Sequence, residues 1–337
     1  MTKIHLDLGI RGYDINIGAK LIDRASEIFN LERRVLIITD SGVPEEYAKT
    51  VAGLSKEARI LTLPEGEETK SMESLSKIYT QMLDFGMTRT DCVVAVGGGV
   101  MGDLAGFAAA SFMRGIDFYN IPSTLLSQVD SSIGGKVAIN FGGIKNIVGA
   151  FYQPKGVIID PSLLRTLDKR QLSNGMAEAV KMALSFDKEL FELMEKEEIT
   201  EEILEQIIIG SLKIKKRVVE SDEHESGVRK VLNLGHTLGH GIESVEMGRL
   251  YHGECVAIGM TKVCSDRVLE RLLPLLKKLG LPTEYDGDLK AATMLISHDK
   301  KCDGGFVSAI FVDEVGSYRI EKMGVEEFCL HVEGARK

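Results

Sequence analysis

The sequence predicts an α/β protein in two parts: an N-terminal, mostly parallel sheet with helices, and then a mainly α-helical C-terminal domain. Three observations support this. Short apolar runs at residues 35–39, 60–63 and 92–96 have the composition of buried strands. These runs alternate with helical patterns, which is typical of the parallel sheets in Rossmann-like nucleotide-binding domains. After residue 160 the strand pattern stops, and helical periodicity continues from residue 163 to about residue 295.

The composition is that of an ordinary globular protein. Of 337 residues, 44% are apolar and 27% are charged, and the net charge of −9 argues against a general nucleic-acid binder. No apolar stretch approaches the roughly 18 residues that span a membrane, and the first residues do not resemble a signal peptide. The five cysteines are scattered and contain no C-x-x-C pair, so we expect a protein of the reducing cytoplasm.

The N-terminal part is expected to begin with a short strand or hairpin. In chain order we then predict a helix over 20–29, strands over 35–39 and 60–63, a helix over 71–85, a strand over 92–96, a helix over 104–113 and a strand over 117–121. The first three of these strands run into polar or glycine-rich turns. Because ligands of parallel sheets bind at the carboxyl ends of strands, these turns are candidate ligand contacts.

The C-terminal part shows helical periodicity with little sign of strands. A clear amphipathic helix is predicted over 203–219, and the runs 306–312 and 318–320 predict a small hairpin around Asp313-Glu314-Val315-Gly316. We therefore predict two domains, residues 1–160 and residues 161–337.

A glycine-rich turn follows the strand at 92–96. The segment Gly97-Gly98-Gly99-Val100-Met101-Gly102-Asp103 lets backbone N–H groups approach a pyrophosphate at the start of a helix. The spacing differs from G-x-G-x-x-G, so a tight strand–helix turn with no ligand is the alternative. Asp103 is expected either to contact the ligand or to cap the helix.

Cations and glycines also alternate between residues 114 and 146. Arg114, Asp130, Lys136, Lys145 and Asn146 stand among small residues, which lets charged groups converge on a phosphate or carboxylate. A solvated, highly charged loop is the alternative.

Three of the seven histidines fall within seventeen residues. His236 and His240 are four apart and share a face if the segment is helical, and His252 follows closely. Imidazoles on neighbouring elements, with one carboxylate such as Glu243 or Glu254, are typical of a catalytic zinc site. Arg229 and Asn233 extend the face of His236 at helical spacing.

Glu178 and Lys181 lie one helical turn apart. Their small and apolar neighbours favour an interior pair, and a surface ion pair is the alternative. The cluster His298-Asp299-Lys300-Lys301 by itself resembles a solvated helix end.

Taken together, these segments resemble the 3-dehydroquinate synthase family over nearly the whole chain. The matching segments, in the family's order, are GGGVMGDLAGF (97–107), STLLSQVDSSIGGK (123–136), KNIVGAFYQP (145–154), NGMAEAVK (174–181), LNLGHTLGH (232–240), HGE (252–254) and DKK (299–301).

The resemblance implies an enzyme that uses NAD and zinc or cobalt to convert 3-deoxy-D-arabino-heptulosonate 7-phosphate into 3-dehydroquinate and phosphate. It implies that Glu178, His236 and His252 bind the metal, and that His240 handles protons or lies beside the metal. The other implied catalytic residues are Asp130, Lys136, Asn146, Lys181 and Glu225. The implied substrate contacts are Arg114, Lys136, Asn146, Lys215, Arg229, Asn233, Lys300 and Lys301. The implied NAD contacts are Asp40, Glu65, Gly66, Glu67, Lys70, Gly99, Val100, Met101, Gly102, Asp103, Ser123, Thr124, Lys136, Lys145, Leu163 and Thr166.

The resemblance further implies a homodimer in which Arg114 reaches across the interface. Three features depart from the family pattern. Val137-Ala138 replaces the usual Thr-Gly, Ser123 replaces a threonine, and the loop after Lys301 is short.

Three other functions are considered. A sister sugar-phosphate cyclase, such as a 2-deoxy-scyllo-inosose or valiolone-type synthase, would share the fold. A metal-dependent polyol dehydrogenase would favour an Asp-x-x-x-His ligand pair, whereas Met182 stands four residues after Glu178. A catalytically inactive nucleotide-binding or scaffolding protein would have lost a metal ligand.

Overall fold

The computed structural model describes residues 1–298 and 304–334 of the chain. The chain divides into two compact units, Met1–Leu167 and Asp168–Lys337. The division follows η5 (Pro161–Thr166), a 3-10 segment directly after the last strand of the first unit. In the described part of the chain, no helix has the length and apolar character needed to cross a membrane.

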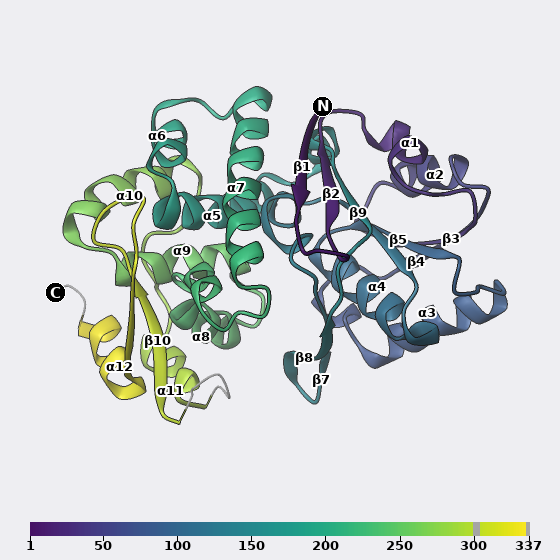
Figure 1. The fold of residues 1–337 in the computed structure, drawn as a ribbon. Coiled ribbons are helices and arrows are strands. Elements are labelled where there is room, and N and C mark those ends of the chain that lie inside the picture. The colour runs from purple at the N-terminus through teal and green to yellow at the C-terminus, as the bar shows by residue number, and fades with distance from the viewer. Residues whose placement is uncertain (299–303, 335–337) are drawn as a thin grey trace. The chain divides into compact units, whose positions relative to one another are not determined.

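The first unit is built on a seven-stranded sheet whose order is β1-β2-β9-β6-β5-β3-β4 (Figure 1). All neighbours are parallel except β1 and β2, so the prediction of a mostly parallel sheet is confirmed. The chain turns outward from β3 to β4 and then returns to β5 on the other side of β3. The carboxyl ends of β3 and β5 therefore form a topological switch point, where ligands of open α/β sheets bind. The strands are β1 (Thr2–Leu6), β2 (Tyr13–Ile17), β3 (Arg34–Asp40), β4 (Glu57–Leu63), β5 (Cys92–Gly97), β6 (Asp117–Pro122) and β9 (Gly156–Ile159).

Helices cover both faces of this sheet, because alternate side chains of its buried strands point to opposite sides. Leu36 and Ile38 of β3 pack with α3 and α4, whereas Val35 and Ile37 pack with η1, α1 and α2. The helical segments are η1 (Ile22–Arg24), α1 (Ala25–Ile28), α2 (Glu45–Gly53), η2 (Glu67–Thr69), α3 (Met72–Asp84), α4 (Gly99–Ser111) and η3 (Phe112–Arg114).

Two helices differ from their predicted ranges. The helix predicted over 20–29 shrinks to η1 and α1, because the Asp160 carboxylate accepts the backbone N–H groups of Lys20 and Ile22 and holds that segment out of the helix. The helix predicted over 104–113 starts at Gly99 instead. It ends at Ser111, and Met113 beyond it has a left-handed φ of 49°.

A second hairpin replaces the loops expected between residues 136 and 151. It consists of β7 (Lys136–Phe141) and β8 (Ile144–Phe151), and it extends away from the main sheet as a separate ribbon (Figure 1). Val137 and Ile139 are buried, and a Cβ atom added to Gly106 of α4 would lie 2.4 Å from Val137. Packing on α4 explains this strand, which local sequence alone did not indicate.

The second unit is mainly helical, as predicted. Its helical segments are α5 (Lys169–Phe186), α6 (Lys188–Lys196), α7 (Glu201–Ser221), η6 (Val228–Asn233), α8 (His236–Glu246), α9 (His252–Val263), α10 (Asp266–Lys278), α11 (Leu289–His298) and α12 (Val325–Gly334). The predicted C-terminal hairpin is present as β10 (Phe306–Phe311) and β11 (Arg319–Gly324).

The helical face predicted from Arg229 through Asn233 to His240 is not continuous. Arg229 and Asn233 belong to the 3-10 segment η6, and Gly235 then has a left-handed φ of 76° before α8 begins at His236. A left-handed residue breaks a helix, so the two parts present their side chains independently.

Candidate functional site

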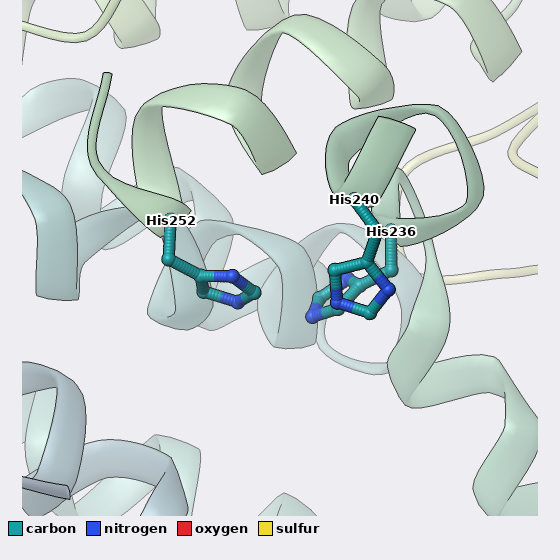
Figure 2. Close-up of side chains that lie close together, drawn as sticks. All are labelled: His236, His240 and His252. Carbon is teal, nitrogen blue, oxygen red and sulfur yellow. The ribbon is translucent and has the colours of Figure 1, made fainter. Parts of the chain in front are cut away.

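Three histidine rings of the second unit turn toward a common point (Figure 2). His236 and His240 come from the first turns of α8, one turn apart, and His252 is the first residue of α9. One ring nitrogen from each lies within 4.8 Å of the others, the spacing of groups that can share a metal ion. The ring centroid of His236 is 5.3 Å from that of His240 and 5.1 Å from that of His252.

Glu178 of α5 adds a carboxylate to these rings. Its Oε1 lies 3.4 Å from Nε2 of His252 and 3.7 Å from Nε2 of His236. Two ligands of a tetrahedral zinc ion, each at about 2.1 Å, are about 3.4 Å apart. Both Glu178 oxygens are buried and accept no well-formed hydrogen bond from the described residues, although Lys181 lies within ion-pair distance. The Glu178 carboxylate and the two imidazole nitrogens therefore stand at the spacing of tetrahedral ligands, so this donor set fits a divalent metal.

The second ring nitrogens of His236 and His252 also have partners. Nδ1 of His252 lies 3.1 Å from Oε2 of Glu243, and Nδ1 of His236 lies 3.1 Å from the Leu234 carbonyl oxygen. An ionised carboxylate and a carbonyl can only accept, so each Nδ1 carries a proton and Nε2 faces Glu178. The role of the Leu234 carbonyl could not be found by motif reasoning, and Glu243 had appeared only as a nearby carboxylate.

Burial and charge set the protonation states of this cluster. Burial alone would raise the pKa of Glu178, but Lys181, His236 and His252 hold it well below its ordinary value. Burial, together with repulsion from Lys181, lowers the pKa of His236 to about 3. Burial also acts to lower the pKa of His252, but Glu178 and Glu243 beside it raise it to about 9. A metal bound here would therefore displace a proton from His252, because a ligating imidazole must be neutral at the ligating nitrogen.

The remaining polar residues predicted in this unit lie on α5, on α7, in the loop after α7 and in η6. Lys181 on α5 and Lys215 on α7 are buried, so the alternative of a surface ion pair for Glu178 and Lys181 is wrong. Glu225 has a left-handed φ of 59° and accepts a 2.6 Å hydrogen bond from Nδ2 of Asn233. The guanidinium of Arg229 donates to the Glu223 carbonyl oxygen at 2.5 Å.

Asp222 holds the segment from Glu225 to Arg229, which leads into η6. The carboxylate of Asp222 accepts the backbone N–H groups of Ser226, Gly227 and Arg229 at 2.8, 2.7 and 3.0 Å. Sequence reasoning did not identify this residue.

In the first unit, predicted NAD contacts gather at the switch point between β3 and β5. Asp40 ends β3, and its Oδ2 would lie 3.6 Å from a Cβ atom added to Gly97 at the end of β5. Burial raises the pKa of Asp40, and the charge of Glu65 adds to this, against hydrogen bonds from Gly42 and Val43.

The glycines of this turn allow close packing within the chain. A Cβ atom at Gly99 would lie 2.9 Å from Oγ of Ser131, and one at Gly102 would lie 3.0 Å from Nδ2 of Asn120. No side chain of the described residues caps the start of α4, so its first N–H groups remain available to an anion. Asp103 does not cap this helix, because it lies inside α4 and its carboxylate pairs with Lys70 instead.

Lys70 is the buried centre of a polar network. Its Nζ donates to Oδ2 of Asp103 at 2.6 Å and to Oδ1 of Asn146. Asn140 joins the same segments: its Oδ1 accepts the Asn146 N–H at 2.9 Å, its Nδ2 donates to Oε1 of Glu67 at 2.8 Å, and its N–H donates to the Lys70 carbonyl at 2.8 Å. The role of Asn140 was not predicted.

The other predicted residues of this unit are more dispersed. Arg114, Lys136 and Lys145 are exposed, and Arg114 has a left-handed φ of 67°. Asp130 lies in η4, one turn of π-helix (Ser127–Ser131). Ser123 donates its N–H to the Gly97 carbonyl, and Tyr47 hydrogen-bonds the Leu163 carbonyl and lies 3.4 Å from Oγ1 of Thr166. The further predicted contacts are Gly66, which has a φ of 103°, Val100 and Met101 in α4, and Thr124 after β6. Lys300 and Lys301 lie outside the described residues.

Comparison with known proteins matches both halves of the chain to one family. A family model described as 3-dehydroquinate synthase N-terminal matches residues 60–174, and one described as 3-dehydroquinate synthase C-terminal matches residues 175–302. A 3-dehydroquinate synthase of Streptococcus sanguinis is 42% identical over 96% of this chain and 98% of its own length.

Solved structures of sister enzymes share the fold. A 2-deoxy-scyllo-inosose synthase crystallised with carbaglucose-6-phosphate, NAD+ and Co2+ has a TM-score of 0.89 at 26% identity, covering 99% of this chain and 100% of that one. A 2-epi-5-epi-valiolone synthase from Streptomyces hygroscopicus with NAD+ and Zn2+ has a TM-score of 0.85 at 25% identity, covering 96% and 97%. The two matched halves and the 42% identity over nearly the full length place the chain in the 3-dehydroquinate synthase family.

Proposed function

We propose that this protein is a 3-dehydroquinate synthase. It converts 3-deoxy-D-arabino-heptulosonate 7-phosphate into 3-dehydroquinate and phosphate, a step of the shikimate pathway to aromatic amino acids, and it depends on NAD and a divalent metal. The observation that carries this proposal beyond family membership is the buried Glu178 carboxylate facing Nε2 of both His236 and His252.

The proposed ligands are Glu178, His236 and His252, with zinc or cobalt as the ion. When bound, the ion acts as a Lewis acid on hydroxyl and carbonyl oxygens of the substrate. Glu243 and the Leu234 carbonyl keep the two rings in the tautomer that presents Nε2. Lys181 keeps Glu178 ionised. A ring nitrogen of His240 lies within 4.8 Å of a ring nitrogen of His236 and of His252. We assign His240 to proton handling.

We assign NAD to the first unit. Supporting this are the switch point at Asp40 and Gly97, the uncapped start of α4 and the neighbouring residues Glu65 and Glu67. When bound there, NAD would accept a hydride from the carbon of a substrate hydroxyl and return it later in the same turnover, so a catalytic quantity would suffice. The carbonyl present in between would acidify the adjacent C–H and allow phosphate to leave by elimination.

The substrate is anionic, and the proposed contacts are mainly cations and amides. Arg114, Lys136, Asn146, Lys215, Arg229 and Asn233 keep the roles that the resemblance implies, with Lys300 and Lys301 in addition. Asn233 and Glu225 hold each other at 2.6 Å, which fixes the Asn233 amide. Cations and planar donors of this kind suit phosphate and carboxylate oxygens.

We further propose a cytoplasmic homodimer. Among the described residues, Cys92, Cys255, Cys264 and Cys329 form no disulfide, which suits a reducing compartment. Phe141, Ile144 and Ile147 on the β7–β8 hairpin are 58%, 44% and 48% exposed, and such apolar patches often mark interfaces. Sedimentation equilibrium tests this state. A monomer at micromolar concentration would contradict it.

The function is tested by incubating the protein with the heptulosonate phosphate, NAD and zinc. Phosphate and 3-dehydroquinate should form in equal amounts with NAD present only in catalytic quantity. Accumulation of NADH in proportion to product would favour a polyol dehydrogenase. Turnover of a hexose 6-phosphate alone would favour a sister cyclase, the second candidate, which the similarity to 2-deoxy-scyllo-inosose synthase supports.

A further inference from the structure

Three side chains of α5 form a stripe that faces the first turn of α9. Arg170, Asn174 and Glu178 are spaced by four residues, so they lie on one face of the helix. Their partners follow in reverse order along α9: Arg170 contacts Glu254, Asn174 contacts Gly253, and Glu178 approaches His252. The proposed metal ligand His252 therefore belongs to a helix start that contacts α5 at three consecutive residues.

The first of these contacts is a bidentate ion pair. Nε and Nη2 of Arg170 donate to the two carboxylate oxygens of Glu254 at 2.7 and 2.8 Å. The guanidinium lies 4.3 Å from the ring centroid of Tyr251, and its Nη2 also donates to the Arg249 carbonyl at 2.6 Å. Glu254 in turn accepts the Tyr251 N–H at 2.7 Å, so this pair fixes the backbone just before His252.

The second contact is a hydrogen bond between Gly253 of α9 and the Asn174 side chain of α5. The N–H groups at a helix start lack partners within the helix, and a short polar side chain just before the helix usually accepts one. Tyr251 occupies that position here, and Oδ1 of Asn174 accepts the Gly253 N–H at 2.6 Å. A Cβ atom on Gly253 would lie 2.0 Å from the Asn174 carbonyl oxygen, so only glycine allows α9 to come this close to α5.

We propose that Asn174, supported by the Arg170–Glu254 pair, is a positioning residue for the metal ligand His252. This inference rests on the proposed metal site. Without the Asn174 amide, the buried Gly253 N–H would lose its partner, and the first turn of α9 would shift to find another. Metal ligands must be held to within roughly 0.5 Å, so this shift would carry Nε2 of His252 away from its 3.4 Å approach to Glu178.

The test measures metal binding directly. Zn2+ affinity is obtained by competition with a chromogenic chelator, and the coordination geometry by the visible absorption of the Co2+-loaded protein. Asn174→Ala should weaken zinc binding by about 10- to 100-fold and change the cobalt spectrum. Asn174→Asp keeps an acceptor oxygen for the Gly253 N–H and should restore both to near the wild-type values. A general loss of packing would not be rescued in this way.

A matched control separates the metal site from stability. Arg271 makes the same type of contact away from the histidines: it is bidentate to Glu195 at 2.9 and 2.5 Å and lies 5.1 Å from the Phe191 ring centroid. Arg170→Gln should weaken zinc binding by about threefold or more, whereas Arg271→Gln should leave it unchanged. If Asn174→Ala fails to fold, the comparison of Arg170→Gln with Arg271→Gln still tests whether α5 positions His252.

The outcomes distinguish the inference from the proposed function. Wild-type affinity and cobalt spectrum in folded Asn174→Ala, or equal effects of Arg170→Gln and Arg271→Gln, would overturn the positioning role alone. If His252→Ala binds zinc as tightly as the wild type, the proposed metal site is overturned and this inference with it.

Discussion

The two units hold their candidate site residues in different ways. In the second unit, Glu178, His236 and His252 come from α5, α8 and α9, and α9 packs closely against each of the other two helices. In the first unit, Lys70, Asn140 and Asn146 come from a loop, a strand irregularity and a hairpin strand whose residues are mostly exposed. The proposed metal ligands are therefore fixed by helix packing, whereas the first-unit residues are fixed mainly by hydrogen bonds between loops.

The difference follows from what each ligand requires. A metal ion needs donor atoms at fixed distances, which rigid helices provide. A large anionic cofactor is held by many weaker contacts, so loops tied together by a polar network are sufficient. If this view is correct, substitutions in the two units should affect different measurements, and the following predictions are ordered by the size of the expected effect.

The largest effect is expected for Glu178, the carboxylate among the proposed metal ligands. Glu178→Gln keeps the shape but removes the charge that balances the cation, so bound zinc and turnover should fall together, with activity reduced by about 1,000-fold or more. Metal content by atomic absorption and a phosphate-release assay measure this. Full metal occupancy with normal turnover would show that Glu178 is not a ligand.

A helix–helix contact should have the next largest effect. A Cβ atom on Gly259 of α9 would lie 2.0 Å from the Gly235 carbonyl oxygen at the start of α8. Gly259→Ala should therefore destabilise the protein by about 1–3 kcal/mol and weaken metal binding, because it moves His252 away from His236. Gly324→Ala, whose added Cβ would meet nothing within 4 Å, is the control. Equal urea midpoints for the two variants would contradict the tight-packing explanation.

A smaller, purely functional effect is expected in the first unit. Asn140 sits at the irregularity between Ile139 and Phe141 and supports Asn146, which has a left-handed φ of 56°. Asn140→Ala should lower kcat/KM by about tenfold, roughly 1.4 kcal/mol, while metal content stays at the wild-type level. Steady-state kinetics test this prediction. The control is Asn30→Ala, which changes an asparagine at an exposed position of the same unit. Loss of metal in Asn140→Ala would break the proposed separation between the units.

The smallest effect concerns the loop that Asp222 organises. Burial acts to raise the pKa of Asp222, but hydrogen bonds from the N–H groups of Arg229, Gly227 and Ser226 lower it to about 2 from a usual 3.8. A lowered carboxyl pKa stabilises the folded state above about pH 4, and this contribution is lost as the pH falls toward about 2.

Asp222→Asn should therefore be less stable than the wild type at neutral pH, and the difference should shrink as the pH falls through this range. Urea unfolding of both proteins at several pH values measures it. A difference that stays constant between about pH 5 and pH 2 would rule out the proposed charge effect.

Much of the fold could be predicted from the sequence because its signals are local. The apolar runs at 35–39, 60–63 and 92–96 predict parallel strands, and the apolar spacing over 203–219 predicts a long helix. The expected burial is correct for β3 and β5 and wrong for β4, because β4 is an edge strand of the sheet and Ile60 on it is 37% exposed. These patterns depend only on which side chains can be buried at a given period. The histidine cluster was also visible, because His236 and His240 are four residues apart on a helix and His252 follows closely.

Other features were decided by tertiary contacts. The β7–β8 hairpin forms because Val137 packs against Gly106, and the helix predicted over 20–29 is shortened because Asp160 binds the N–H groups of Lys20 and Ile22. Likewise, the sequence did not decide whether Glu178 and Lys181 form a surface or an interior pair. Burial decides between a surface and an interior pair, and burial depends on residues far away in the chain. The hydrogen bond between Asn174 and Gly253, 79 residues later, is an example of such a distant contact.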